Sequence, residues 1–248
     1  MNATLHILPD ARQVTEALAE TWKRLADAAI ADHGSFYVAL AGGSTPRQLY
    51  ARLAEEPYRS AVDWSRVQVF FGDERCVPRD HADSNYRMAS DALLAHVPIP
   101  AAQIHPLFDP ALSPGRNADD YTAQLLATLP LDENGLPVFD LVLLGMGEDG
   151  HTASLFPGTS ILQESERMVA AVHVEKLQAW RVSLTFAAIN RARAVAVTVV
   201  GEAKAGVLAS VLTEATPTYP IQRVTPRGEL HWFLDEAAAQ RLPAQRRP

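Results

Sequence analysis

An unbroken apolar run, Leu141 to Leu144, constrains the fold more than any other feature of the sequence. Such a run is typical of a strand buried on both faces, as in parallel sheets that are covered by helices. Three glycines follow within six residues, so the backbone can turn tightly and approach a ligand closely. Glu148, Asp149 and His151 lie within that turn. Because open α/β sheets bind ligands at the carboxyl ends of their strands, we expect the functional site here.

The same glycines, Gly145, Gly147 and Gly150, also fit the G-x-G-x-x-G fingerprint of dinucleotide-binding proteins. That fingerprint requires a helix of several turns after the third glycine, with its N-terminus facing the pyrophosphate. Pro157 comes seven residues after Gly150 and would interrupt such a helix. Two carboxylates also lie inside the loop that would have to hold a dianion. A dinucleotide is therefore not expected, and the sequence predicts no cofactor.

Strand-like and helix-like segments alternate along the rest of the chain. The predicted strands are 5–8, 36–41, 67–71, the central run before Gly145, 168–174, 181–186 and 194–200. The predicted helices include 10–30, 46–53, one that ends at Leu94, 117–129 and one that runs from the 201–204 turn through Leu212. This alternation predicts an α/β fold, with a doubly wound, mostly parallel sheet and helices on both faces. We expect one domain over residues 1–248.

Composition excludes several classes of partner. The net charge of -7 argues against nucleic acid, because no dense basic face is available. The single cysteine, Cys76, excludes an internal disulfide and suits a reducing compartment. No signal peptide or membrane-spanning run is evident, so a soluble, cytoplasmic protein is expected. The histidines lack the spacing of metal ligands, and no metal site is predicted.

A second motif follows the 36–41 strand, where Gly42, Gly43, Ser44 and Thr45 precede a helix with Pro46 in its first turn. Glycine N–H groups, two hydroxyls and a helix N-terminus together make a cradle for an anion, most naturally a phosphate. The motif lacks the lysine and the spacing of a P-loop, so a nucleoside triphosphate is not implied. The alternative is a turn that binds nothing, with Ser44 or Thr45 capping the helix.

Charged or polar clusters follow four apolar strands: Gly42 to Thr45, Asp73 to Arg75, Glu148 to His151 and Gly201 to Lys204. The carboxyl ends of parallel strands lie at one edge of a sheet, so we expect these clusters to converge. Of Asp73, Glu74 and Arg75, one is expected only to hold the following loop through local ion pairing.

Five motifs carry a resemblance that spans nearly the whole chain. They are Leu40 to Pro46, Phe71 to Pro78 with Ser84 and Asn85, Gly145 to Pro157, Arg181 to Thr185 and Gly201 to Ala205. In this order they resemble the bacterial type of 6-phosphogluconolactonase, in the wider family that includes glucosamine-6-phosphate deaminase. The deaminase branch carries a glutamate five residues after the histidine, where this chain has Phe156, and a tyrosine where it has Arg75. Both departures favour the lactonase branch.

The resemblance implies hydrolysis of 6-phospho-D-glucono-1,5-lactone to 6-phosphogluconate, the second step of the pentose phosphate pathway. His151 is the expected general base toward water and then the acid toward the ring oxygen, since an unperturbed imidazole has a pKa of about 6.5. Asp149 or Glu148 would orient it. Arg75 would contact the lactone or its oxyanion, with Asp73 fixing that arginine or binding sugar hydroxyls.

The phosphate is the other group by which we expect the substrate to be bound. By resemblance, Gly42, Gly43, Ser44 and Thr45 supply its cradle, and Arg181 and Lys204 supply the balancing cations. Arg47 is a further candidate, one residue into the helix. A sugar-phosphate isomerase or deaminase and a non-catalytic sugar-phosphate sensor remain as alternatives. The oligomeric state is left open, and a monomer is compatible with the sequence.

Overall fold

Six parallel strands form the central sheet of the protein in the computed structural model, which describes residues 3–214 and 216–243. The strand order is β1-β9-β8-β5-β2-β3, and every neighbouring pair is parallel. The bounds are Ala3–Leu8 for β1, Phe36–Leu40 for β2, Val67–Phe71 for β3, Leu141–Gly145 for β5, Ala194–Val199 for β8 and Glu229–Asp235 for β9. The predicted parallel α/β sheet is therefore confirmed.

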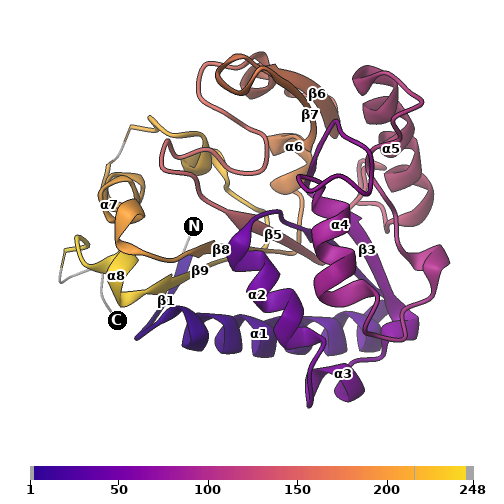
Figure 1. Ribbon diagram of the computed structural model, residues 1–248, viewed down its shortest axis with the longest axis horizontal. Helices are drawn as coiled ribbons and strands as arrows, with labels where there is room; N and C mark the ends of the chain where they lie inside the picture. The colour runs from indigo at the N-terminus through magenta and orange to yellow at the C-terminus, as the bar shows by residue number, and fades with distance from the viewer. Residues whose placement is uncertain (1–2, 215, 244–248) are drawn as a thin grey trace.

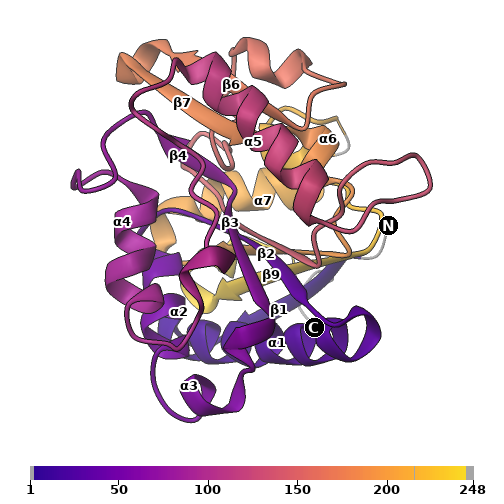
Figure 2. The same ribbon diagram turned by 90° about the vertical axis from the view of Figure 1, so that its right-hand side faces the viewer.

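Helices cover both faces of this sheet, as Figures 1 and 2 show. The long helix α1 runs along one face, with α2 beside it, whereas α5 and α6 lie on the other side of the sheet. The bounds are Ala11–His33 for α1, Ser44–Leu53 for α2, Tyr58–Ala61 for α3, Asn85–Ala89 for α4, Pro114–Thr128 for α5, Phe186–Ile189 for α6, Ala205–Thr213 for α7 and Glu236–Ala239 for α8. None of the helices in these described ranges is long and apolar enough to cross a lipid bilayer.

The two strands predicted at 168–174 and 181–186 form a separate small sheet with β4, residues Asp73–Arg75. These strands are β6, Val169–Val174, and β7, Ala179–Leu184, and the sheet is antiparallel with the order β4-β7-β6. A four-residue connection joins β6 to β7. Such a short connection allows only antiparallel neighbours, because a parallel crossover needs a dozen or more residues.

The start of α2 differs from the prediction that Ser44 or Thr45 caps it. Gly43 occupies the N-cap position with a φ of 105°, and no side chain makes a capping hydrogen bond. This backbone conformation is one that glycine adopts without steric cost. Ser44 and Thr45 consequently lie inside the first turn, and their hydroxyls are not used to close the helix.

Helix α1 illustrates how sequence and packing agree. Asp10 accepts a hydrogen bond from the N–H of Gln13 at 2.8 Å and caps the first turn, as is usual for aspartate before a helix. Leu18 and Trp22 are buried against the sheet. At the other end Gly34, with a φ of 85°, stops the helix in the left-handed conformation. The helix is therefore fixed at both termini and along one face.

A buried tyrosine, Tyr50, fixes the end of β2 next to the Gly42 to Thr45 turn. Its hydroxyl accepts a hydrogen bond from the N–H of Ala41 at 2.9 Å and donates one to the carbonyl of the same residue at 2.8 Å. Tyr50 is fully buried, so no water can replace these bonds. The side chain thus satisfies the N–H and the carbonyl of Ala41 at the point where the chain leaves the sheet.

We expect Tyr50→Phe to lower the free energy of unfolding by about 1–3 kcal/mol, the cost of leaving buried polar groups unpaired. Urea denaturation would measure the loss. Tyr37→Phe, on β2, is the control, because the Tyr37 hydroxyl makes no hydrogen bond with the described residues. Equal losses in the two variants would contradict the role given to the Tyr50 hydroxyl.

Candidate active site

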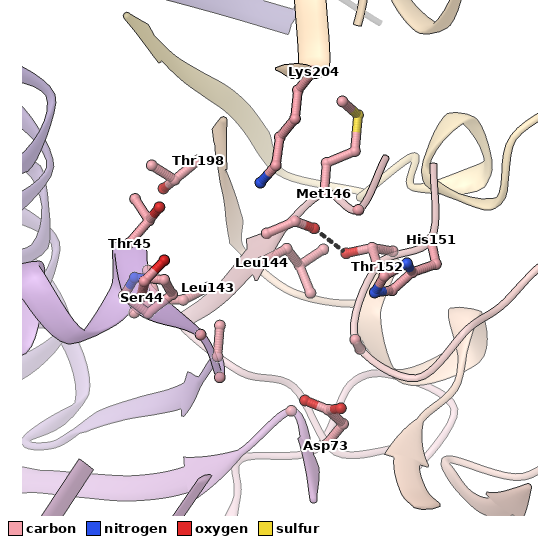
Figure 3. A pocket seen from close by; sticks show the side chains of 18 of the residues that line it. Ser44, Thr45, Asp73, Leu143, Leu144, Met146, His151, Thr152, Thr198 and Lys204 are labelled. Carbon is pink, nitrogen blue, oxygen red and sulfur yellow. Dashed lines mark hydrogen bonds between the residues drawn. The ribbon is translucent and has the colours of Figure 1, made fainter. Parts of the chain in front are cut away.

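Each of the four clusters predicted at the strand ends contributes residues to one pocket of about 270 Å³ at the carboxyl edge of the large sheet. The pocket is lined by Gly42, Gly43, Ser44, Thr45, Asp73, Arg75, Gly147, His151 and Lys204, together with residues of β5 and β8. Figure 3 shows the ammonium of Lys204 pointing into the pocket, with the hydroxyl groups on one side and His151 on the other. Parallel strands therefore bring together residues that lie more than 150 positions apart in the sequence.

His151 lies on the turn after β5 and is held from two sides. Its Nδ1 lies 2.5 Å from Oδ1 of Asp149, and its ring stacks on Phe156 with a centroid distance of 4.1 Å. A Cβ atom at Gly147 would overlap the imidazole, so this position requires glycine. About 29% of the His151 side chain is exposed, which leaves the ring accessible from the pocket.

Asp149, rather than Glu148, is the carboxylate that pairs with His151. Glu148 is exposed and makes no hydrogen bond with the described residues, and its charge acts instead on Lys204. Partial burial raises the pKa of Asp149, but hydrogen bonds from Lys176 and His151 outweigh this effect and hold the pKa at about 2. An ionised carboxylate is only an acceptor, so Nδ1 of His151 carries the hydrogen and donates a hydrogen bond to Asp149. The other ring nitrogen, Nε2, is then free to accept a proton.

Because the pKa of Asp149 is depressed below its usual value of about 3.9, its contribution to stability is present above that pH and is lost as the pH falls toward 2. We therefore expect wild type to exceed Asp149→Asn in unfolding free energy at pH 5, by a margin that shrinks steadily below pH 4. Denaturant titrations of both proteins across this range would measure it. A margin that is independent of pH would contradict the ionised state of Asp149.

Three hydroxyl groups and a lysine form the opposite side of the pocket. Ser44 and Thr45 come from the first turn of α2, Thr198 from β8, and Lys204 from the turn before α7. Within the described residues, none of these four side chains has a hydrogen-bond or ion-pair partner. Burial lowers the pKa of Lys204, opposed by the nearby charges of Glu148 and Asp235. Unused donors around a half-buried ammonium make a site suited to an anion.

Thr198 was missed by the sequence analysis. It is the one polar residue in the buried run 194–200, and it lies next to the last residue of β8. A lone threonine in an apolar strand ordinarily reads as a β-branched core residue. Its position at a carboxyl strand end was the signal that could have found it.

Glu74 is the member of the Asp73-Glu74-Arg75 cluster that only holds the loop. Its carboxylate oxygens accept hydrogen bonds from the backbone N–H groups of Arg75, Asn85 and Tyr86, each with an N···O distance of 2.8 Å. Burial raises the pKa of Glu74, and these hydrogen bonds oppose the rise. Glu74 is 3% exposed and does not line the pocket. Glu74 is thus the residue of the three that holds the loop, but it does so through hydrogen bonds from backbone N–H groups and not through the expected ion pairing.

Asp73 and Arg75 face the pocket instead. Asp73 is buried, and its Oδ2 accepts a hydrogen bond from the hydroxyl of Ser154 at 2.6 Å. Asn85 donates to the other carboxylate oxygen at 3.2 Å. Arg75 donates from Nη1 to the carbonyl of Asp83, and no carboxylate pairs with its guanidinium within the described chain. Asp73 is thus fixed by neutral donors, and Arg75 retains donors for a ligand.

Arg181 lies beside Arg75 and not beside Lys204. The two arginines are directly opposite each other in the pairing of β4 with β7. Arg181 does not line the main pocket; with Arg75 it lines an adjoining cavity of about 450 Å³. Its Nε and one Nη are buried without a hydrogen-bond partner among the described residues. Burial, and then the charge of Arg75, lower the pKa of Arg181.

The architecture and the pocket define a class: an α/β protein with a histidine–aspartate pair and a cluster of hydroxyl groups around a lysine at the carboxyl edge of a parallel sheet. A family model described as glucosamine-6-phosphate isomerases/6-phosphogluconolactonase matches residues 9–232. The chain belongs to this family.

Individual relatives are similar over most of their length. A protein of Synechocystis named 6-phosphogluconolactonase is 43% identical, with 86% of this chain and 88% of the relative covered. One of Nostoc with the same name is 37% identical over 98% of this chain and 99% of the relative. Among solved structures, 6-phosphogluconolactonase from Trypanosoma brucei superposes with a TM-score of 0.87, at 33% identity, covering 98% of this chain and 99% of that one.

Proposed function

We propose that the protein hydrolyses 6-phospho-D-glucono-1,5-lactone to 6-phosphogluconate. The observation that carries this proposal is the position of the His151–Asp149 pair across one pocket from the hydroxyls of Ser44 and Thr45 and the ammonium of Lys204. A phosphorylated lactone needs both parts: a base beside its carbonyl carbon, and a cradle for a remote dianion. The family and the names of its relatives support the same activity.

In the proposed mechanism, Nε2 of His151 accepts a proton from water as the water oxygen attacks C1 of the lactone. Asp149 holds the ring with Nδ1–H toward its carboxylate and stabilises the imidazolium that forms. The tetrahedral intermediate then collapses. The bond between C1 and the ring oxygen breaks, and His151 returns the proton to that oxygen. The new carboxylic acid loses its own proton to solvent at neutral pH.

The substrate's phosphate is placed between Ser44, Thr45 and Lys204 in this proposal, with backbone N–H groups at Gly42 and Gly43 completing the cradle. Thr198 adds a hydroxyl from the neighbouring strand. The charge of Lys204 then balances one of the two phosphate charges. Arg47, by contrast, does not line this pocket; it borders a separate surface hollow and has no role in the mechanism.

Arg75 is proposed to donate to the lactone carbonyl as negative charge develops on it, a role for which fixed donors are most effective. Asp73 is proposed to bind sugar hydroxyls, since it lines the pocket together with Arg75. For Arg181 we propose a supporting role: its charge stands behind Arg75 and strengthens the attraction for an anionic ligand.

We expect His151→Asn to reduce kcat for lactone hydrolysis by about 10²- to 10⁴-fold, the usual contribution of a general base, while KM changes little. The assay follows acid release at mildly acidic pH, where spontaneous opening is slow. His96→Asn, at an exposed histidine far from the pocket, is the control. Product analysis with an amino-sugar phosphate tests the deaminase alternative. Turnover retained in His151→Asn would remove the base role.

Lys204→Met should raise KM for the phosphorylated lactone by about 10- to 100-fold, because a charge-assisted hydrogen bond is lost. Unphosphorylated glucono-1,5-lactone is the internal control, since it has no group for Lys204 to bind. Its turnover should be nearly the same in wild type and variant. A similar loss for both lactones would show that Lys204 acts on the reacting carbons instead.

A further inference from the structure

The connection between β6 and β7 brings a second lysine to the His151 turn. This connection includes a short 3-10 helix, Glu175–Leu177, and the side chain of Lys176 extends from it to the turn after β5. The chain contains only three lysines: Lys23, Lys176 and Lys204. Lys204 lies in the pocket, and Lys23 pairs with Asp27 on α1. Lys176 was not singled out by the sequence analysis and does not line the pocket.

Lys176 contacts both groups that hold the imidazole. Its ammonium donates to Oδ2 of Asp149, while Oδ1 of the same carboxylate meets Nδ1 of His151. The ammonium also lies 4.6 Å from the centroid of the Phe156 ring, and that ring stacks on His151. The Lys176 ammonium therefore contacts both Asp149, which is hydrogen-bonded to His151, and Phe156, which stacks on it.

We propose that Lys176 is a positioning residue for His151. It fixes Asp149 through Oδ2, so that Oδ1 stays in line with Nδ1–H and Nε2 remains the free nitrogen that faces the pocket. The inference rests on the proposed function, because the value of this arrangement is a base held ready for water. Lys176 acts through Asp149 and Phe156 and makes no contact with the lactone.

Two other roles for Lys176 would have different consequences for His151 and for substrate binding. A surface ion pair that only adds stability is worth about 0–1 kcal/mol, and the Lys176 side chain is 52% exposed. Such a pair would leave the protonation of His151 unchanged. A substrate-binding lysine would have to reach the pocket, whose lining includes Lys204 but not Lys176. The kinetic constants and the state of the ring together separate these roles from the proposed one.

The test compares wild type with Lys176→Met, which keeps an apolar stem and removes the charge, and with Lys176→Arg, which restores it. For Lys176→Met we expect kcat to fall by about 10-fold, equivalent to about 1.4 kcal/mol of transition-state stabilisation, with KM within about 2-fold. Lys176→Arg should recover most of kcat. Lys23→Met is the control for loss of one lysine charge and should behave as wild type.

A second readout does not depend on catalysis. Long-range ¹H–¹⁵N NMR spectra of the histidine rings report which nitrogen of His151 carries the proton. We expect the Nδ1–H form to dominate in wild type and in Lys176→Arg. The Nε2–H form should grow in Lys176→Met, as in Asp149→Asn, while thermal unfolding verifies that each variant is folded.

The possible results separate cleanly. An unchanged ring tautomer, an unchanged kcat, or a rise in KM alone in Lys176→Met would each overturn the positioning role. Absence of lactone hydrolysis in wild type would instead remove the proposed function. The NMR comparison would then still decide whether Lys176 controls the tautomer of His151.

Discussion

The parallel pairing of β5 with β2 on one side and β8 on the other is the constraint on which the pocket depends. Each of these strands ends at the same edge of the sheet; Gly42 and Gly147 line the pocket just after β2 and β5, and β8 contributes Thr198 near its end. A ladder of backbone hydrogen bonds therefore sets the spacing between the His151 turn and the Gly43 turn. Side chains only refine a geometry that the main chain has already fixed.

Around His151, local and distant contributions have different tasks. Gly147 and Asp149 act within the turn, where Gly147 leaves room for the ring and Asp149 accepts a hydrogen bond from its Nδ1–H. Support from Lys176 arrives from the small antiparallel sheet, which is a separate layer of the fold. The small sheet thus carries Arg75 and Arg181 on β4 and β7, and its connecting segment contributes Lys176, which contacts Asp149 beside His151. The large sheet sets the position of the site, and the small sheet holds some of its side chains.

Much of this arrangement could be predicted from the sequence, because buried strands and glycine turns have strong local signatures. The convergence of the clusters follows largely from parallel topology, although Asp73 and Arg75 are also held by the pairing of β4 with β7. The separate pairing of β6 with β7 could not be predicted as easily, since strand periodicity does not reveal which sheet a strand joins. Lys176 was missed for a related reason: a charged residue in a short connection usually faces solvent, and its partner Asp149 is 27 positions away. Arg181 was placed with the phosphate by resemblance, whereas strand register puts it opposite Arg75.

The facing guanidinium groups of Arg75 and Arg181 have a wider consequence for a protein with a net charge of -7. At long range, such a molecule repels an anionic sugar phosphate. Arg75 and Lys204 line the pocket, so at short range they attract the same ligand, against the opposing charge of Asp73 in the same lining. An anionic ligand is thus repelled at a distance by the net charge and attracted only near the pocket. The association rate should consequently rise, up to a point, as added salt screens the long-range repulsion more strongly than the attraction by the recessed cations.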